Sequence, residues 1–307
     1  MRNQAYCTAS ILLYDIRPHV RQQTRASLIR LGFRDIADVG SVTDLTGLVD
    51  VAGFDLLILA TAALDDGVAE LLMALRRHRR GVDPFAPVIL TSWQGSSRFV
   101  KSMLGCGTDH YLIWPYAPAQ LGLRIDALVR CRKPFVETRD YLGPDRRGGG
   151  GRRSGAGSVV EVPNALRAAV EGRPDLAPSP AAIKAARTGL ERIRIGNLAR
   201  RVGAIAKIIK QRIDERDYRL RAAADMDDLL ATLAVMRAAA EATDLRHLLS
   251  FCQAVEDVAG KLRETAPVWD PKGLALLEQA ALALRVAVEM DDDSARAALK
   301  LAGQLVH

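Results

Sequence analysis

The sequence predicts an α/β domain built on a five-stranded parallel sheet, followed by an all-α helical bundle. Two observations predict the first part. Short apolar runs alternate with helical patterns five times between residues 10 and 129, as expected for successive β-α-β units. The run at 54–60 contains five consecutive apolar residues and stops at small and acidic ones, which is typical of a buried parallel strand. The second part is predicted because only helical patterns follow residue 163.

The first half of the α/β domain contains three of the expected strands. Residues 10–15 (SILLYD) form a buried strand that ends in an acid, and 18–31 carry apolar side chains at helical spacing. Residues 36–39 form a weaker strand, and 42–51 a short helix. The strand at 54–60 follows. Its carboxyl end lies where an open α/β sheet places its ligands.

The second half of the domain continues the alternation. Residues 68–77 form a helix, 87–91 (PVILT) a strand and 97–104 the next helix. The last strand is expected at 110–113 and the closing helix at 118–129. Because each strand is followed by a helix, the sheet is expected to be parallel and covered on both faces.

The helical part begins with a long helix, expected to start at Pro178 or Ser179 with Pro180 in its first turn. Its apolar residues follow the 3-4 spacing of a heptad seam, and short connections favour antiparallel neighbours in a bundle. The later helices are expected at 225–242, 244–264, 272–290 and 294–306, with the capping acids Asp227, Asp244, Asp270 and Asp293 at or near their starts. The seam consists of Ile195, Leu198, Val202, Ile205 and Ile209, and an earlier one of Ile183, Ala186, Leu190 and Ile193.

Composition places the chain among globular proteins with few aromatic residues. It has 307 residues, of which 49% are hydrophobic and 5% aromatic, enough for two domains with their own cores. Its four cysteines form no CxxC pair and no histidine lies at metal-ligand spacing, so we expect reduced thiols, no metal and no cofactor. No signal peptide is visible, and no apolar run reaches the roughly 20 residues of a membrane span. We therefore expect a soluble, cytoplasmic protein.

The net charge of +7 is distributed unevenly. Residues 1–150 carry 19 basic and 15 acidic side chains, residues 184–221 carry 12 and 4, and residues 222–307 carry 8 and 14. A basic helix is thus followed by acidic ones. We interpret this pattern as charge complementarity within the helical domain.

Four motifs in the first domain resemble a known family in their order and spacing. They are ILLYDIRP in the first strand, FDLLILATAALDDG in the third, PVILTS in the fourth and GTDHYLIWP in the fifth. Between residues 11 and 132 the chain resembles the CheY-like receiver domains of two-component response regulators. The resemblance implies a flavodoxin-like sheet and a role in phosphorelay signal transduction.

Positions that handle the phosphoryl group in that family differ here. The phosphoacceptor aspartate, at the end of the third strand, corresponds to Ala60, and the lysine after the fifth strand to Trp114. Of the acids that bind magnesium in the family, Asp15 is present, but Ile16 and Arg17 fill the next two positions. Together with Thr91, which matches the switch hydroxyl, Asp15, Ala60 and Trp114 make up what we call the degenerate pocket.

These differences predict a receiver that cannot be phosphorylated at the usual site. A hard divalent cation needs several oxygen ligands, which one carboxylate beside a guanidinium does not supply. Without a nucleophilic carboxylate, a metal or a cationic clamp, a phosphoryl group is neither accepted nor stabilised. Asp65 and Asp66 lie in the loop beyond the strand and are interpreted as helix N-terminal acids. We expect no catalytic residue and no enzymatic activity.

The resemblance also implies a partner-binding surface. Receivers contact partners through the fourth helix, fifth strand and fifth helix, and Trp114 lies at the edge of that surface. Its indole either fills the space left by the missing phosphate and lysine or forms a binding face with Tyr111, the switch aromatic, and Trp93. By resemblance, the bond between Trp114 and Pro115 is cis.

A polar segment and a glycine-rich stretch follow the α/β domain. Residues 131–147 contain apolar side chains among the polar ones, so we expect them to lie across the first domain. The stretch GGGGRRSGAGS at 148–158 is typical of a flexible linker, and the arginines there and at 146–147 could contact nucleic acid or an acidic partner, although such arginines usually keep a linker soluble. The expected division is a receiver-like domain at 1–133, a tail and linker at 134–160 and a helical domain at 161–307.

The basic helix at 184–221 allows a second class of function. Its cations could neutralise nucleic-acid phosphates, which supply much of the affinity of such binding. However, no helix-turn-helix pattern is present, and isoleucines occur where base-stacking aromatics would be expected. A solvated cationic face on a bundle helix is the simpler account. The residues of this face are Arg192, Arg194, Arg200, Arg201, Lys207 and Lys210.

A histidine phosphotransfer domain would present an exposed histidine followed by a lysine and a glycine. The candidate within a helix is His247, which is followed by LLS, so we interpret it as an ordinary surface or half-buried histidine. We therefore expect a non-catalytic signalling protein that docks a sensor kinase or a regulator. The long helix could also join two copies of the chain through its seam. The alternatives are a nucleic-acid-binding regulator and a phosphotransfer or phosphatase accessory protein.

Overall fold

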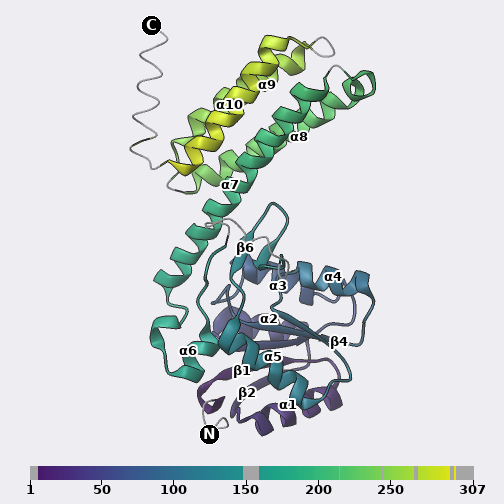
Figure 1. Ribbon diagram of the computed structural model, residues 1–307. Coiled ribbons are helices and arrows are strands. Elements are labelled where there is room, and N and C mark those ends of the chain that lie inside the picture. The colour runs from purple at the N-terminus through teal and green to yellow at the C-terminus, as the bar shows by residue number, and fades with distance from the viewer. Residues whose placement is uncertain are drawn as a thin grey trace. The chain divides into compact units, whose positions relative to one another are not determined.

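The chain folds into two compact units, Met1–Leu190 and Glu191–His307. The strands lie in the first unit, and the described residues of the second are mainly helical (Figure 1). The computed structural model describes residues 6–147, 159–213, 215–243, 245–265, 269–290 and 294.

The sheet of the first unit consists of β1 (Ser10–Tyr14), β2 (Asp35–Val39), β3 (Leu56–Ala60), β4 (Val88–Ser92) and β5 (His110–Ile113). All pairings are parallel and the strand order is β2-β1-β3-β4-β5. β3 and β4 are buried along their whole length, which explains why their sequences show no apolar-polar alternation. This order is that of a doubly wound, flavodoxin-like sheet, so the predicted fold class is confirmed.

Five helices cover the sheet: α1 (Pro18–Leu31), α2 (Val42–Val51), α3 (Val68–Arg76), α4 (Ser97–Gly105) and α5 (Pro118–Cys131). α2, α3 and α4 pack on the face that carries Leu12 and Leu57, whereas α1 and α5 pack on the face that carries Ile11 and Ile58. Adjacent residues of one strand enter opposite layers because side chains alternate along a strand. These strands and helices differ from the predicted ones only at their ends.

An antiparallel hairpin follows α5 and consists of β6 (Phe135–Glu137) and β7 (Leu142–Pro144). Phe135 is completely buried. Gly107 has a φ of 89°, and a Cβ atom on it would lie 2.5 Å from the carbonyl oxygen of Leu142, so only glycine fits at this approach. The prediction that residues 131–147 lie across the first domain is confirmed.

A buried cluster of charges lies beside this hairpin. The side chains of Arg76, Asp109 and Arg132 are 1%, 3% and 5% exposed. The Asp109 carboxylate accepts hydrogen bonds from Arg76 at 3.0 Å, from Arg132 at 2.7 Å and from the backbone N–H of Val88 at 2.9 Å. Both guanidinium groups also lie over the ring of Phe135, 5.2 and 5.1 Å from its centroid. Burial of these charges is tolerated because each charged group has a partner of opposite charge and accepts or donates hydrogen bonds.

The first unit extends further along the chain than the sequence predicts. It includes α6 (Ala165–Glu171), the 3-10 helix η2 (Pro174–Leu176) and the first turns of α7 (Pro180–Arg212). Leu166 of α6 is buried in the layer of α1 and α5, and the first apolar residues of α7 pack with Phe85 and Phe135. The predicted start of the helical domain at 161 is therefore corrected, because these long-range contacts attach residues 161–190 to the sheet domain.

The glycine- and arginine-rich stretch at 148–158 lies between two segments of the first unit. Phe135 and Val160 exchange two backbone hydrogen bonds of 2.8 Å, and the N–H of Asp145 donates to the carbonyl oxygen of Pro134 at 2.7 Å. The segments before and after the stretch thus meet at the start of the hairpin. The stretch itself lies outside the described residues, but it does not join the two units, so the prediction of an interdomain linker at 134–160 is corrected.

The second unit consists of the rest of α7 with α8 (Arg216–Glu241), α9 (Leu248–Glu264) and α10 (Pro271–Glu289), which share one hydrophobic core. Asp270 caps α10 by accepting two backbone N–H groups, as predicted, whereas Asp227 lies inside α8. The predicted caps Asp244 and Asp293 and the predicted helix at 294–306, apart from residue 294, fall outside the described residues. None of the helices in the described ranges has the length and apolar character needed to span a bilayer.

The heptad seam of α7 packs within the chain. Ile195, Leu198, Val202 and Ile209 are buried in the core formed with α8, α9 and α10. The apolar side chains of such a seam can pack against helices of the same chain or of a second one. Here the helices that cover the seam belong to the same chain. These seam residues are therefore engaged within the chain, and a homodimer through the long helix stays a prediction.

Candidate functional site

The carboxyl edge of the sheet brings the four residues of the degenerate pocket together. Ala60 ends β3 and lies beside Thr91 of β4 in the strand register. Asp15 directly follows β1, and Trp114 directly follows β5. Asp15, Ala60 and Thr91 are buried. The grouping predicted from the sequence follows from the rule that parallel strands present their carboxyl ends at one edge.

The Asp15 carboxylate is engaged by an arginine two residues later. Arg17 donates from Nε to Oδ1 at 3.1 Å and from Nη2 to Oδ2 at 3.2 Å, and its backbone N–H donates to Oδ1 at 2.9 Å. Bidentate pairs of this kind are among the stronger hydrogen bonds in proteins. Arg21 Nη1 also donates to the carbonyl oxygen of Asp15 at 2.6 Å. The Asp15 carboxylate is therefore paired with the guanidinium of Arg17, and the Asp15 backbone carbonyl is bonded to that of Arg21.

The loop after β3 contains two acids, and one of them forms hydrogen bonds with the loop's own residues. Asp66 Oδ2 accepts from the N–H of Ala62 at 2.7 Å and from the hydroxyl of Thr61 at 2.8 Å, and its Oδ1 accepts from the N–H of Val68 at 3.1 Å. These bonds fix the loop and the first turn of α3. Asp65 is exposed. The interpretation of the pair as helix N-terminal acids is confirmed for Asp66.

Trp114 of the degenerate pocket lies between two further aromatic rings, those of Trp93 and Tyr116. Trp114 stacks on Tyr116 with centroids 4.6 Å apart, and Trp93 lies 5.8 Å from Trp114. The Arg17 guanidinium lies over Trp93, 5.2 Å from the ring centroid. Trp114 is only partly exposed, which favours its space-filling interpretation, while Trp93 is 52% exposed. The bond between Trp114 and Pro115 is cis, as the resemblance implied.

Tyr111, the predicted switch aromatic, is fixed against the loop after β4. Its hydroxyl donates to the carbonyl oxygen of Gln94 at 2.6 Å. Burial raises the pKa of Tyr111, with a hydrogen bond to Ser92 opposing the effect, so the hydroxyl keeps its proton near neutral pH. The ring is therefore held as a neutral donor.

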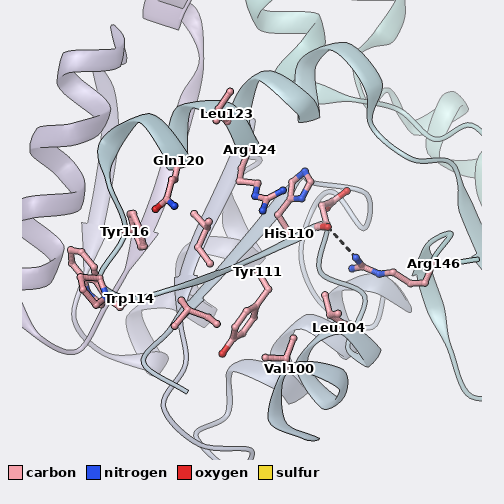
Figure 2. Close-up of a pocket in the computed structure, with 14 residues that line it drawn as sticks. Val100, Leu104, His110, Tyr111, Trp114, Tyr116, Gln120, Leu123, Arg124 and Arg146 are labelled. Atoms are coloured by element: carbon pink, nitrogen blue, oxygen red, sulfur yellow. Dashed lines mark hydrogen bonds between the residues drawn. The ribbon is translucent and has the colours of Figure 1, made fainter. Parts of the chain in front are cut away.

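A groove of about 860 Å³ runs along β5 between α4 and α5, beside the degenerate pocket (Figure 2). Its lining includes Tyr111, Trp114 and Pro115, the three residues predicted to form a partner surface. Trp114 and Tyr116 lie at one end of the view in Figure 2, and Arg146 lies at the other. The predicted partner surface is therefore concave.

One end of the groove carries positive charge. Arg124 is exposed on α5, and Arg146, which follows β7, donates to the carbonyl oxygens of Thr108 and Asp109, the latter at 3.3 Å (Figure 2). His110 lies close to both arginines. Burial lowers the pKa of His110 to about 4, and the two arginine charges act in the same direction against that of Asp109. His110 is therefore neutral at pH 7, and the arginines provide the charge.

The cationic end of the groove could not be located from the sequence. Arg146 was expected to contact nucleic acid or an acidic partner or, as is more usual, to keep a linker soluble, and its position in the groove depends on how the hairpin folds back. The apolar residues in 131–147 indicated a segment packed on the domain, but they did not say where. The sequence held a weak signal that Arg124 would be left without a partner on its own helix. The residues four positions away on each side, Gln120 and Leu128, are not acidic.

The basic face of α7 is partly neutralised within its own unit. Arg201 pairs with Asp228 of α8 at 2.6 Å, and Lys210 with Glu278 of α10 at 2.5 Å. These pairs favour the interpretation of internal charge complementarity and leave fewer cations for nucleic-acid phosphates. Of the other predicted members, Arg194 pairs with Glu191 at 3.2 Å, while Arg192, Arg200 and Lys207 are exposed.

His247 does not fit a phosphotransfer role. It is buried, and its Nε2 forms a hydrogen bond of 3.2 Å with the carbonyl oxygen of Ala287. A phosphotransfer histidine must reach a partner, so this burial argues against such a role. It also corrects the expectation of a surface or half-buried histidine within a helix, since His247 is buried and is the N-cap residue of α9. Within the described ranges, no group of three or more His, Cys, Asp or Glu side chains is placed to hold a metal ion.

Neither a protein-family model nor a curated protein matches the chain. Among solved structures, it is similar to a signal receiver domain of a histidine kinase from Clostridium thermocellum, with 20% identity over 40% of this chain and 98% of that one and a TM-score of 0.35. A CheY-like receiver domain protein from Methanospirillum hungatei shows 20% identity over 38% and 90%, with a TM-score of 0.34. The response regulator DrrB of Thermotoga maritima, an OmpR/PhoB homolog, shows 20% identity over 42% and 57%, with a TM-score of 0.36. The similarity to response regulator receiver domains is one of fold and covers the N-terminal part of the chain.

Proposed function

We propose that the protein is a response-regulator-like signalling protein whose receiver-like domain takes up no phosphoryl group and acts by binding another protein. The partner is a sensor kinase or another regulator, and no catalytic step is involved. The observation that carries the proposal is the chemistry of the carboxyl edge. Ala60 supplies no nucleophile there, and Arg17 holds the carboxylate of Asp15 at both oxygens.

The absence of phosphoryl uptake follows from what the reaction requires. An aspartyl phosphate forms when a carboxylate oxygen attacks phosphorus, and the methyl group of Ala60 has no lone pair. Magnesium at Asp15 would have to displace a bidentate guanidinium and would then have one carboxylate there, although it prefers an octahedral shell of oxygens. The neutral indole of Trp114 replaces the family's lysine charge. Phosphoryl transfer needs a nucleophile, a metal site and a cationic clamp, and here the first and third are missing and the second is weakened.

The surface beside the pocket supports the binding role. Ile113 of β5 and Leu123 of α5 line the groove with exposures of 47% and 68%. Trp93 exposes about half of its surface nearby and stacks on Arg17. Large exposed apolar and aromatic groups around a concave surface are characteristic of protein contact sites.

The proposal is tested by incubating the intact chain with acetyl phosphate and Mg²⁺ and measuring its mass. We expect no added phosphoryl group under conditions that modify a receiver with a complete acid set, run alongside as a positive control. The Ala60→Asp variant is also expected to remain unmodified, because Arg17 still occupies Asp15. A phosphoryl adduct on the unaltered chain that hydroxylamine removes, as it removes acyl phosphates, would refute the proposal.

A second comparison isolates the role of Arg17. In the double variant Arg17→Asp with Ala60→Asp, three carboxylates meet at the carboxyl edge and no guanidinium competes for Asp15. We expect this variant to bind Mg²⁺ measurably by calorimetry, whereas the Ala60→Asp variant does not. Equal Mg²⁺ binding by both variants would show that Arg17 does not block the site.

A further inference from the structure

We propose that the first unit binds the phosphate backbone of a nucleic-acid duplex through a patch of cations at the amino edge of its sheet, opposite the degenerate pocket. The patch is formed by the loop that joins α3 to β4 and by the first turns of α7. Its members, which we call the arginine patch, are Arg77, Arg79, Arg80, Lys184 and Arg187. The inference is separate from the proposed function, which concerns the carboxyl edge.

The loop after α3 begins with a run of basic residues. Residues 76–80 read RRHRR and contain no acid. The first of them, Arg76, is buried and bonded to Asp109. The other four are exposed. Short arginine-rich runs that stay at the surface are typical of nucleic-acid contact sites.

Backbone hydrogen bonds fix this loop against the end of α3. The N–H of His78 donates to the carbonyl oxygen of Leu75 at 2.8 Å. The N–H of Arg79 donates to the carbonyl oxygen of Ala74 at 2.9 Å. His78 has a φ of 52°, a left-handed conformation that a residue other than glycine adopts at some cost. The arginines on either side of it are therefore carried by an ordered backbone, which reduces the entropy lost on binding.

A hydrogen bond joins the loop to α7. Arg187 Nη1 lies 2.9 Å from His78 Nδ1. Arginine has no acceptor atom, so Arg187 donates and the imidazole accepts with its unprotonated nitrogen. Burial and the charge of Arg187 both lower the pKa of His78, which agrees with a neutral ring. Lys184 is exposed one turn before Arg187, so the two cations are neighbours on the helix surface.

Few carboxylates offset these charges. Within the described part of the chain, the side chains of Arg77, Arg79 and Lys184 form neither an ion pair nor a hydrogen bond. Arg80 lies 3.5 Å from Asp50, and their side chains are 49% and 36% exposed, so this surface pair contributes little. The cations repel one another, and a bound polyanion would relieve that repulsion.

The acids that follow the two segments are engaged elsewhere. Asp83 is only 4% exposed, and its Oδ1 accepts from the N–H of Phe85 at 2.9 Å. Glu191, one turn after Arg187, pairs with Arg194 at 3.2 Å. The patch therefore keeps its positive charge in the folded chain.

The chemistry of the patch favours a duplex over a single strand. Guanidinium groups match the oxygens of phosphate, and phosphate contacts supply essentially all of the affinity of sequence-independent binding. Single strands bind also through aromatic faces on which their bases stack. Phe85 and Phe135, which pack with the first turns of α7, are 1% and 0% exposed and offer no such face. A duplex needs none, because its bases are already stacked inside it.

The test measures fluorescence anisotropy of a labelled duplex of about 20 base pairs, roughly 70 Å long, as DNA and as RNA, with the intact chain. We expect a Kd of about 10⁻⁶–10⁻⁴ M near physiological salt. With about four phosphate contacts, the logarithm of the association constant should fall with that of the salt concentration with a slope of about −3 to −4. Binding of either duplex would support the proposal and identify the nucleic acid. Failure of both to bind at about 0.05 M salt would overturn it.

Matched double variants then locate the binding site. Arg77→Gln with Arg79→Gln should make the slope less negative by about two and weaken binding at about 0.05 M salt at least about tenfold. Arg200→Gln with Lys207→Gln is the control, because it removes two exposed charges from the part of α7 that belongs to the second unit. Circular dichroism of each variant verifies that it is folded.

Equal losses of affinity in the two double variants would show that binding depends on overall charge, and would overturn the proposal. Tighter binding of a single strand than of the duplex would do the same. Displacement of the duplex by polyglutamate at equal charge concentration would assign the patch to an acidic protein, and binding to phosphatidylglycerol vesicles alone would assign it to a membrane surface. Each of these results would overturn the proposal and leave the proposed function intact, since none involves phosphoryl uptake.

Discussion

Replacing Asp109 with asparagine would remove the negative charge on which two buried arginines depend. In the folded chain, the carboxylate accepts from Arg76 at 3.0 Å and from Arg132 at 2.7 Å, and none of the three side chains is more than 5% exposed. Asparagine has nearly the same shape, so packing around Phe135 is expected to change little. The variant therefore isolates the loss of charge from the loss of volume.

The cost follows from leaving buried cations unpaired. Removing one partner of a buried ion pair typically costs about 3–5 kcal/mol, because the remaining charge is not hydrated. Arg76 is the more deeply buried of the two arginines, and burial already lowers its pKa to about 10 despite the opposing charge of Asp109. We expect the free energy of unfolding of the first unit to fall by about 3–5 kcal/mol, a large part of the roughly 5–15 kcal/mol of a typical domain.

The assay is urea unfolding of the intact chain, followed by far-UV circular dichroism and tryptophan fluorescence, with the free energy extrapolated to zero denaturant. Asp140→Asn is the matched control, because the Asp140 side chain is 90% exposed and its ion pair with Arg139 is long, at 4.0 Å. We expect that control to change the free energy by less than about 0.5 kcal/mol. A loss below about 1 kcal/mol in Asp109→Asn would refute the reasoning, since it would mean that the arginines do not depend on the carboxylate.

The Asp109→Asn and Asp140→Asn variants should also differ in how their stability depends on pH. Burial tends to raise the pKa of Asp109, but the charges of Arg132 and Arg76 outweigh it and hold the pKa below its usual range. A folded pKa below the unfolded value means that the stabilisation is complete above about pH 4 and is lost as the pH falls through the folded pKa. Acid should therefore destabilise Asp109→Asn less steeply than Asp140→Asn in that range.

Two further predictions concern His110 and Gly107. The pKa of His110 is lowered to about 4 in the folded chain, so its contribution to stability is complete above about pH 6.5 and falls as the pH drops towards 4, by at most about 1.4 kcal/mol per pH unit. His110→Gln should flatten the stability profile between these values, and an unchanged slope in thermal unfolding would contradict this. Gly107→Ala would place a methyl group 2.5 Å from the Leu142 carbonyl oxygen at a φ of 89°, with an expected loss of about 1–3 kcal/mol. Gly47→Ala is its control, because nothing lies within 4 Å of a Cβ atom there, and equal melting temperatures for the two variants would refute the close approach.

The α/β fold and the degenerate pocket could be predicted because they depend on local patterns and on one rule of topology. Apolar runs and helical periods locate strands and helices without knowledge of their neighbours. Once the sheet is parallel, the ends of its strands share an edge, so Asp15, Ala60 and Trp114 were expected at that edge, where the structure places them. The outcome at Asp15 was also partly visible, since Arg17 is only two residues away.

The domain boundary and the groove charge could not be predicted because they depend on distant contacts. A glycine-rich stretch looks the same whether it joins two domains or leaves and re-enters one, and the pairing of Phe135 with Val160 decides between these cases. A heptad seam likewise does not reveal which helices will cover it. The position of Arg146 depends on the hairpin that returns it to β5, which no local pattern specifies.

The pairing of Phe135 with Val160 closes the glycine-rich stretch at its base. Because loop-closure entropy grows slowly, lengthening such a stretch twofold costs only roughly 0.6 kcal/mol. A change confined to residues 148–158 leaves the anchoring bonds of the hairpin in place, since those bonds lie outside this stretch. A protease cut there would leave the two fragments joined by the sheet domain, whereas a fragment truncated at residue 133 would lack Phe135 and expose the charges of Arg76 and Arg132 that pack against it. Expression boundaries for the sheet domain are therefore better placed beyond Leu190 than at the end of the receiver resemblance.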